Sequence, residues 1–186
     1  MIEGNHATDL GVQVPPTQYV SASYCSPERF AAYSYQIKET LASGARRVLE
    51  IGVGNGLVTF LLRRAGVQVD TVDHDPALEP THVASVLELP FERNAYDALI
   101  CFQVLEHLPW NSLPRAVQEI ARVAGTHVIV SVPHISRRIA ITLEWARIGR
   151  KSLAFEVDRD DPMKFDGEHY WEIGRGVTAE KVCRVF

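Results

Sequence analysis

The sequence predicts an α/β protein built on a doubly wound, mainly parallel sheet with helices on both faces. Continuous apolar runs at Arg47 to Ile51, Asp97 to Phe102 and His127 to Val132 are typical of strands buried on both faces. Segments with helical spacing of apolar residues separate these runs, which is the pattern of right-handed crossover connections. The first run also ends in alternating glycines directly before a helix, a junction typical of this class.

Composition limits the classes of protein that this chain can represent. With 186 residues, 46% of them apolar and 23% charged, it is suited to one sizeable folded core. A net charge of −4 argues against a broad phosphate-binding surface and gives no strong nucleic-acid signal. No apolar run reaches the roughly 20 residues of a membrane span, and the polar Met1 to Leu10 is unlike a secretory signal. Cys25, Cys101 and Cys183 form no disulfide pattern, so we expect a cytoplasmic protein without a membrane part.

Residues 1–45 are interpreted as an N-terminal arm followed by a helix. Ser26 and Pro27 are typical of the N-cap and first position of a helix, and Gly44 is typical of its end. Helical spacing predicts that the buried face carries Phe30, Ser34, Ile37 and Leu41.

Residues 46–133 are expected to form the core. Gly66 and Gly125 mark helix ends, Ser112 is a candidate N-cap, and β-branched residues dominate the runs between them. The expected order is strand Arg47 to Ile51, helix Asn55 to Ala65, strand Val67 to Val72, a weak strand Thr81 to Ser85, strand Asp97 to Phe102, helix Ser112 to Gly125 and strand His127 to Val132.

Residues 134–186 are less regular than the core. Ile139, Leu143 and Trp145 or Ala146 predict an amphipathic helix from Ile135 to Arg147. The aromatic and titratable stretch Phe165 to Gly174 is suited to an active-site cover, and its part His169 to Ile173 equally to a strand. Thr178 would cap a short last helix.

The glycine loop after the first strand predicts a nucleotide site. Gly52, Gly54 and Gly56 allow a tight turn and a close approach of a ligand to the backbone, whereas an ordinary turn needs only one or two glycines. A dinucleotide fingerprint would have its third glycine at Leu57. Glu50 would repel a pyrophosphate but attract a cation. The site therefore favours an adenosine that carries an amine or amino acid.

A candidate ribose-binding acid follows the second strand. Asp73 stands at the strand tip, about twenty residues after the loop, where a carboxylate can accept both ribose hydroxyls. The alternative is that Asp73 is simply an exposed acid at a strand end. Asp75, just before Pro76, is better suited to shaping the turn.

Several stretches together resemble the class I S-adenosylmethionine-dependent methyltransferases of the small-molecule branch, those with methyltransferase domains of type 11 or 12. The stretches are Val48 to Gly56, Thr71 to Asp75, Leu87 to Phe91, Tyr96 to Cys101 and Val104 to Leu108. The resemblance implies a Rossmann-like fold, S-adenosylmethionine as cofactor, methyl transfer (EC 2.1.1.-) and a small-molecule acceptor. The family sheet usually closes with two further strands, so we expect a C-terminal part that is truncated or finishes the sheet differently.

The resemblance also assigns residues to the cofactor. It implies that Glu50, with the backbone of Gly52, Gly54 and Gly56, holds the methionine part and that Asp73 holds the ribose. It further implies that His74 lies against the adenine and that Gln103 lines the other side of the cofactor. Ser85 stands where relatives often have an acid for the adenine amino group, a departure that leaves the Val86 amide to reach the ring.

Methyl transfer from a sulfonium needs positioning above all, and a general base only if the acceptor starts protonated. His107 and His134, just past the fourth and fifth strands, are the candidate bases, and His169 could join them from a cover. Each also has a structural alternative as a packing or surface residue.

A metal site is considered and set aside. Gln103, Glu106 and His107 are similar in spacing to residues that hold a divalent metal in some relatives, but neutral Gln103 replaces an acid. No other ligand cluster with metal spacing is visible, so we expect no metal.

Three functional hypotheses remain. The first is a methyltransferase acting on a small molecule, and the second is a catalytically inactive module that binds the cofactor or a partner on the same fold. A nicotinamide enzyme is disfavoured by Leu57 and Glu50. A homodimer is an open possibility in either of the first two cases.

Overall fold

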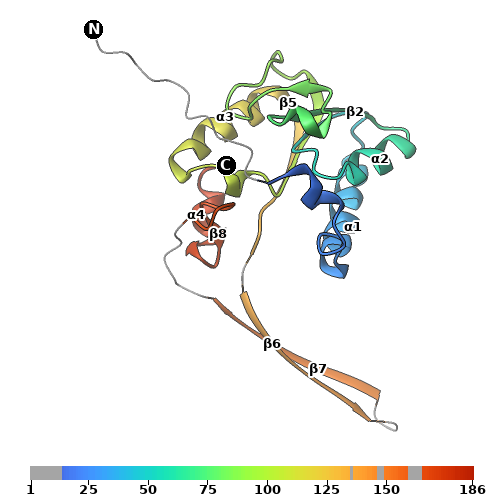
Figure 1. Cartoon of the computed structure of the whole chain (residues 1–186), viewed down its shortest axis with the longest axis vertical. Coiled ribbons are helices and arrows are strands. Elements are labelled where there is room, and N and C mark those ends of the chain that lie inside the picture. The colour runs from blue at the N-terminus through green and yellow to red at the C-terminus, as the bar shows by residue number, and fades with distance from the viewer. Residues whose placement is uncertain (1–13, 135, 146–148, 159–164) are drawn as a thin grey trace.

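A parallel five-stranded sheet lies at the centre of the computed structural model, which describes residues 14–134, 136–145, 149–158 and 165–186 (Figure 1). Its order is β3-β2-β1-β4-β5, and every described pairing in it is parallel. The strands are β1 Arg47–Ile51, β2 Gln68–Asp73, β3 His82–Val83, β4 Tyr96–Phe102 and β5 Ala124–Ser131. The order reverses direction between β1 and β4, the place where open α/β sheets bind ligands. The predicted fold class is confirmed.

Helices cover both faces of this sheet. The main ones are α1 Pro27–Ala42, α2 Leu57–Arg64 and α3 Leu113–Val123, and the short ones are η1 Pro16–Val20, η2 Pro76–Leu78, η3 Leu105–His107, η4 Trp110–Ser112 and α4 Ala179–Cys183. Alternate residues of β1 point to opposite faces of the sheet. Val48 belongs to the hydrophobic cluster on the α2 side, and Leu49 belongs to the cluster on the α3 side. No helix in the described part of the chain is long and apolar enough to cross a membrane.

Helix α1 begins where the sequence predicts but buries a different face. The Ser26 side chain accepts a hydrogen bond from the Arg29 backbone N–H at 3.3 Å, as expected of an N-cap. Phe30 and Leu41, expected to be buried, are 50% and 42% exposed, whereas Gln36 is 7% exposed. The Gln36 side-chain nitrogen donates to the Ser131 hydroxyl at 3.2 Å, whereas its side-chain oxygen is buried without a hydrogen-bond partner among the described residues.

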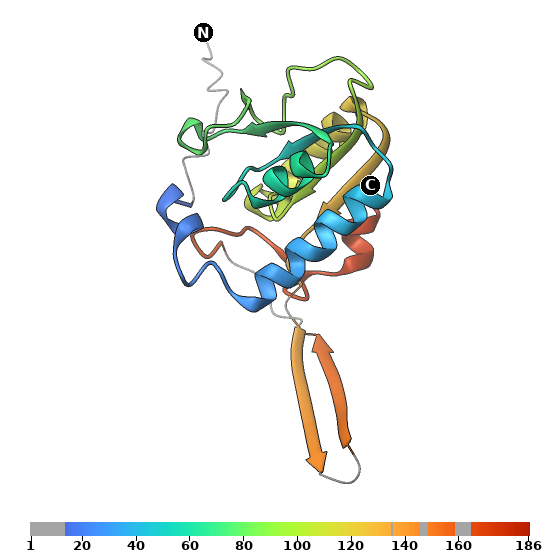
Figure 2. The same ribbon diagram turned by 90° about the vertical axis from the view of Figure 1, so that its right-hand side faces the viewer.

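The helix expected from Ile135 to Arg147 is wrong, because a β-hairpin occupies this region. Strands β6 Ser136–Trp145 and β7 Gly149–Asp158 pair in antiparallel register and extend away from the central sheet (Figures 1 and 2). The sequence from Ile139 to Trp145 alternates apolar residues at every second position, which is the strand period. Ile135 and residues 146–148 lie outside the described residues.

The C-terminal segment 165–186 packs on the connection after β4 instead of completing the central sheet. The Trp171 side chain is 2% exposed, and its indole N–H donates to the Leu108 carbonyl at 3.1 Å. Strands β8 Glu172–Ile173 and β9 Gly176–Val177 form a small separate sheet, and α4 follows with its predicted cap at Thr178. Among the described residues, the C-terminal strands pair only with each other and not with the central sheet.

The three cysteines are free, as their spacing predicts. Cys25 and Cys183 are exposed, whereas Cys101 lies fully buried in β4. Burial raises the pKa of the Cys101 thiol far above its usual range, so this residue acts as a small apolar core side chain.

Candidate functional site

The glycine loop joins the end of β1 to the start of α2. Gly52, Gly54 and Gly56 have φ angles of +84°, +54° and +71°, in the left-handed region that favours glycine. A Cβ on Gly52 would overlap the Val104 side chain, which follows β4. The Gly52 N–H donates to the Val72 carbonyl at 2.8 Å, and this bond holds the loop against the end of β2.

Asp73, the last residue of β2, is joined directly to this loop. One of its carboxylate oxygens accepts the Val53 N–H at 3.0 Å, and the other accepts the Asp75 N–H at 3.0 Å and lies 3.3 Å from His74 Nδ1. Burial opposes its ionisation, but these hydrogen bonds outweigh burial and hold the pKa of Asp73 below its usual value. Asp73 is thus an ionised acceptor at the predicted place, 9% exposed instead of freely solvated.

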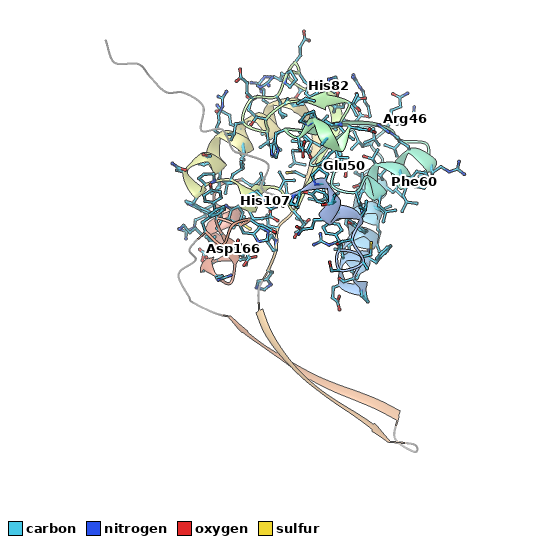
Figure 3. The ribbon with its side chains drawn as sticks, viewed as in Figure 1. Arg46, Glu50, Phe60, His82, His107 and Asp166 are labelled. Atoms are coloured by element: carbon cyan, nitrogen blue, oxygen red, sulfur yellow. The ribbon has the colours of Figure 1, made fainter. Side chains whose placement is uncertain are left out.

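Glu50 lies in β1 (Figure 3), on the side that faces α2, and the residue is 3% exposed. The Thr59 hydroxyl of α2 donates a hydrogen bond to it. Burial raises the pKa of Glu50 to about 7, although Thr59 and the nearby Arg63 act in the opposite direction. A cation beside this group would favour the ionised form, which is the electrostatic role that the sequence predicts for Glu50.

The predicted adenine-side residues differ in how they are held. The His74 side chain is 54% exposed, and its hydrogen bond to Asp73 raises its pKa. Ser85 is exposed, and its hydroxyl accepts the Leu87 N–H at 3.2 Å within its own turn. Val86 is buried with its side chain in the core. The structure therefore gives Ser85 a local turn contact and leaves its proposed ligand contact untested.

Gln103 follows β4 at the same edge of the sheet as the glycine loop. Its backbone has a φ of +57°, and its N–H donates to the Ser131 carbonyl at 2.8 Å. Its side-chain amide lies 3.4 Å from the Ser131 hydroxyl. Gln103 therefore links the ends of β4 and β5. The next residue, Val104, is the one whose side chain would overlap a Cβ at position 52.

The two candidate bases have different surroundings. His107 in η3 is partly buried, its Nδ1 lies 2.8 Å from the Glu168 carbonyl, and its ring lies 4.8 Å from that of His169. Burial lowers the pKa of His107, which favours the neutral imidazole that a general base requires. His134 is exposed just past β5, where its backbone forms a bridge with Ile173.

Tyr19 and Tyr24 lie beside the glycine loop, although no sequence motif marks them as part of the site. A Cβ added to Gly54 would come within 3.8 Å of Tyr19 and 3.7 Å of the Tyr24 hydroxyl, so both side chains lie over the glycine loop. Burial and then the negative charge of Asp73 raise the pKa of Tyr19 to about 12. In the sequence, the presence of two tyrosines in the N-terminal arm is the one feature that could have indicated this contact.

Glu106 and Glu172 are two buried acids near His107 that the sequence does not indicate as a pair. Glu106 is 1% exposed and Glu172 is 4% exposed, although they come from distant parts of the chain. Burial raises the pKa of Glu106 to about 8, and the negative charge of Glu172 adds to the effect. Figure 3 shows the labelled His107 beside the C-terminal segment that carries Asp166.

Comparison with known proteins adds a family match to this geometry. Residues 49–130 match the family model described as a methyltransferase domain. An uncharacterized methyltransferase of Mycobacterium tuberculosis is 36% identical over 93 residues, which cover 45% of this chain and 37% of that protein. A ubiquinone biosynthesis O-methyltransferase of Xanthomonas campestris is 31% identical over 96 residues, 43% of this chain and 40% of that protein. The match thus spans well under half the length of these relatives.

Solved structures share the fold at low sequence identity. The N-methyltransferase NodS of Bradyrhizobium japonicum, in complex with S-adenosyl-L-homocysteine, aligns with a TM-score of 0.56 at 13% identity, over 75% of this chain and 94% of that chain. The [4+2]-cyclase SpnF aligns with a TM-score of 0.52 at 17% identity, over 83% of this chain and 54% of that chain. The two titles name different reactions, so the shared fold alone does not identify the chemistry.

Proposed function

We propose that residues 49–130 form a class I S-adenosylmethionine-dependent methyltransferase domain and that the protein uses S-adenosylmethionine to methylate a small-molecule acceptor. The observation that carries the proposal is the hydrogen bond from the Val53 N–H to the Asp73 carboxylate. It joins the glycine loop to the candidate ribose acid at the carboxyl ends of two neighbouring strands. The likeness to an O-methyltransferase of ubiquinone biosynthesis supports a small organic acceptor.

In the proposed site, two acids bind different parts of the cofactor. Glu50 and the glycine loop would bind the methionine part, and Asp73 would bind the ribose hydroxyls. The adenine and the other side of the cofactor would be surrounded by His74, Ser85, Val86 and Gln103. When bound, the cofactor supplies an activated methyl group on a sulfonium. The protein then needs to hold the acceptor in line with that methyl group, and His107 or His134 would remove the acceptor proton.

Isothermal titration calorimetry with S-adenosylmethionine and S-adenosylhomocysteine tests the first half of this proposal. We expect saturable binding of one ligand per chain, and its absence in a folded protein would contradict the assignment. A panel of hydroxyl, amine and carbon acceptors, assayed for methylated product by mass spectrometry, then tests turnover.

An inactive cofactor-binding module is the second candidate, and one observation favours it. The Ser85 hydroxyl is engaged within its own turn, and no carboxylate stands at this position for the adenine amino group. Binding without turnover across the acceptor panel would support this candidate.

The buried Glu50 leads to a pH prediction. Because burial raises its pKa to about 7 and a bound ammonium group favours its ionised form, affinity for S-adenosylhomocysteine should rise with pH. The ionised fraction of a group with this pKa grows about tenfold between pH 6 and pH 8, so we expect roughly tenfold tighter binding. Calorimetry at pH 6, 7 and 8 measures this change.

Two controls isolate the effect of Glu50 from other titrating groups. 5′-Methylthioadenosine, which lacks the amino-acid part, should bind with no such dependence, and Glu50→Gln should remove the dependence for S-adenosylhomocysteine. An equal pH dependence for both ligands would show that Glu50 does not contact the ammonium group.

A further inference from the structure

The hairpin β6–β7 stands apart from the rest of the fold. Each strand has ten residues, and within the described part of the chain the two strands pair only with each other. Figures 1 and 2 show the hairpin extending away from the central sheet. A lone two-stranded hairpin is marginally stable in water, and each outer edge leaves a row of backbone N–H and C=O groups unpaired. We propose that the outer edge of β6 pairs with β6 of a second copy of this chain.

The pairing register divides the hairpin into an apolar and a polar face. Cross-strand partners, and every second residue along a strand, share a face. The first face receives the cross-strand pairs Ile139–Phe155, Ile141–Leu153, Leu143–Lys151 and Trp145–Gly149. The second face receives the pairs Arg138–Glu156, Ala140–Ala154, Thr142–Ser152 and Glu144–Arg150. A continuous apolar row on a projecting element is typical of an interaction surface.

Strand β6 is complementary to itself in antiparallel register. Two-fold symmetry places residues of the same face opposite each other, so an axis at Ile141 is allowed. About this axis, Ile139 stands opposite Leu143 of the second copy and continues the apolar row. On the polar face, Arg138 stands opposite Glu144 of the second copy, and symmetry repeats this pair of opposite charges. The charges and the apolar residues of β6 thus match in one and the same register.

The outer edge of β7 is less suited to the same pairing. It carries Arg150 and Lys151 in succession, and charged residues, lysine above all, oppose association of edge strands. About an axis at Leu153, Lys151 would stand opposite Phe155 of the second copy and interrupt the apolar row. Pairing through β6 alone closes a dimer, because a two-fold interface uses the same edge of both copies.

A lipid surface is the rival partner for an amphipathic hairpin. Attraction to anionic lipids requires an excess of lysine and arginine. The described hairpin has four basic and three acidic residues, namely Arg137, Arg138, Arg150, Lys151, Glu144, Glu156 and Asp158. Such a near balance of charge favours a partner that carries both signs in complementary order, and the second copy is such a partner.

Sedimentation velocity of the full chain over the micromolar range tests the interface. We expect a dimer for the unaltered protein and a monomer for Ile141→Lys, because this substitution places two lysines opposite each other at the two-fold axis. Leu153→Lys is the matched control. It introduces the same residue at the cross-strand partner of Ile141, on the same face of the hairpin but away from the β6 edge, so it should stay dimeric.

A charge exchange between two variants tests the register. Arg138→Glu and Glu144→Arg each place like charges opposite each other in a homodimer, so each should weaken self-association roughly tenfold. An equimolar mixture of the two variants should dimerise as the unaltered protein does, because both facing pairs of the mixed dimer again have opposite charges. Effects of each substitution within its own hairpin persist in the mixture, so they cannot cause this recovery.

Three results would overturn the proposal. The first is an unaltered chain that stays monomeric throughout the micromolar range, including one that instead binds vesicles containing phosphatidylserine. The second is equal weakening of the dimer by Ile141→Lys and Leu153→Lys, which would indicate contact through the apolar face and not the β6 edge. The third is a charge-exchange mixture no more dimeric than its components. Circular dichroism confirms that each variant is folded, and none of these measurements depends on the proposed methyl transfer.

Discussion

Replacement of Trp171 by alanine is expected to lower the free energy of unfolding by about 3–5 kcal/mol, the usual range for a fully buried tryptophan. The Trp171 side chain is 2% exposed, donates to the Leu108 carbonyl at 3.1 Å, and packs edge-on against Trp110 at 5.2 Å. The variant loses all of these contacts and leaves a cavity between the C-terminal segment and the core. Urea unfolding followed by circular dichroism measures the loss.

Tyr35→Ala provides the comparison for this experiment. Tyr35 is an aromatic residue of α1 that is 67% exposed, so its removal should cost well under 1 kcal/mol. A Trp171→Ala variant as stable as Tyr35→Ala would mean that the C-terminal segment does not pack on the core.

The core of the fold could be predicted because its signals are local. Strands β1 and β4 and the second half of β5 are short, mainly apolar runs, and glycines mark several junctions between strands and helices. The pairing of the glycine loop with Asp73 follows from the same pattern, since carboxyl ends of neighbouring parallel strands meet at one edge. These features need no knowledge of distant contacts.

The hairpin β6–β7 shows where local signals are ambiguous. Ile139 and Leu143 are spaced as on a helix, but Ile139, Ile141, Leu143 and Trp145 are equally spaced as on a strand. The helical spacing predicts the helix from Ile135 to Arg147, which the structure does not contain. Alternation of apolar residues over several positions favours the strand, and the segment forms strand β6.

The rest of the candidate site could not be read from the sequence, because distant segments build it. Tyr19 reaches the glycine loop from the N-terminal arm, and His169 reaches η3 from the C-terminal segment. Burial of Gln36 in α1 likewise depends on a hydrogen bond to Ser131, far along the chain. Hydrophobic periodicity carries no information on such contacts, so the buried polar groups become visible only in three dimensions.

Replacement of Asp73 by alanine is expected to weaken binding of S-adenosylhomocysteine about ten- to a hundredfold. This corresponds to roughly 1.5–3 kcal/mol, the scale of hydrogen bonds to a charged group. Asp73 is ionised and stands at the tip of β2, where it would accept the ribose hydroxyls. Calorimetry measures the affinity, with Asp70→Ala as control, since Asp70 lies on the same strand but interacts with Arg47 and Tyr96 instead.

Asp73 also supports the glycine loop through the Val53 N–H, so a weaker affinity alone would not identify the ribose contact. The 2′,3′-dideoxy analogue of S-adenosylhomocysteine separates the two roles. The unaltered protein should bind this analogue ten- to a hundredfold more weakly than the parent ligand, because the carboxylate then has no hydroxyls to accept. In Asp73→Ala the difference between the two ligands should disappear. If the variant weakens both ligands equally and the difference persists, Asp73 acts only by shaping the loop, and another group holds the ribose.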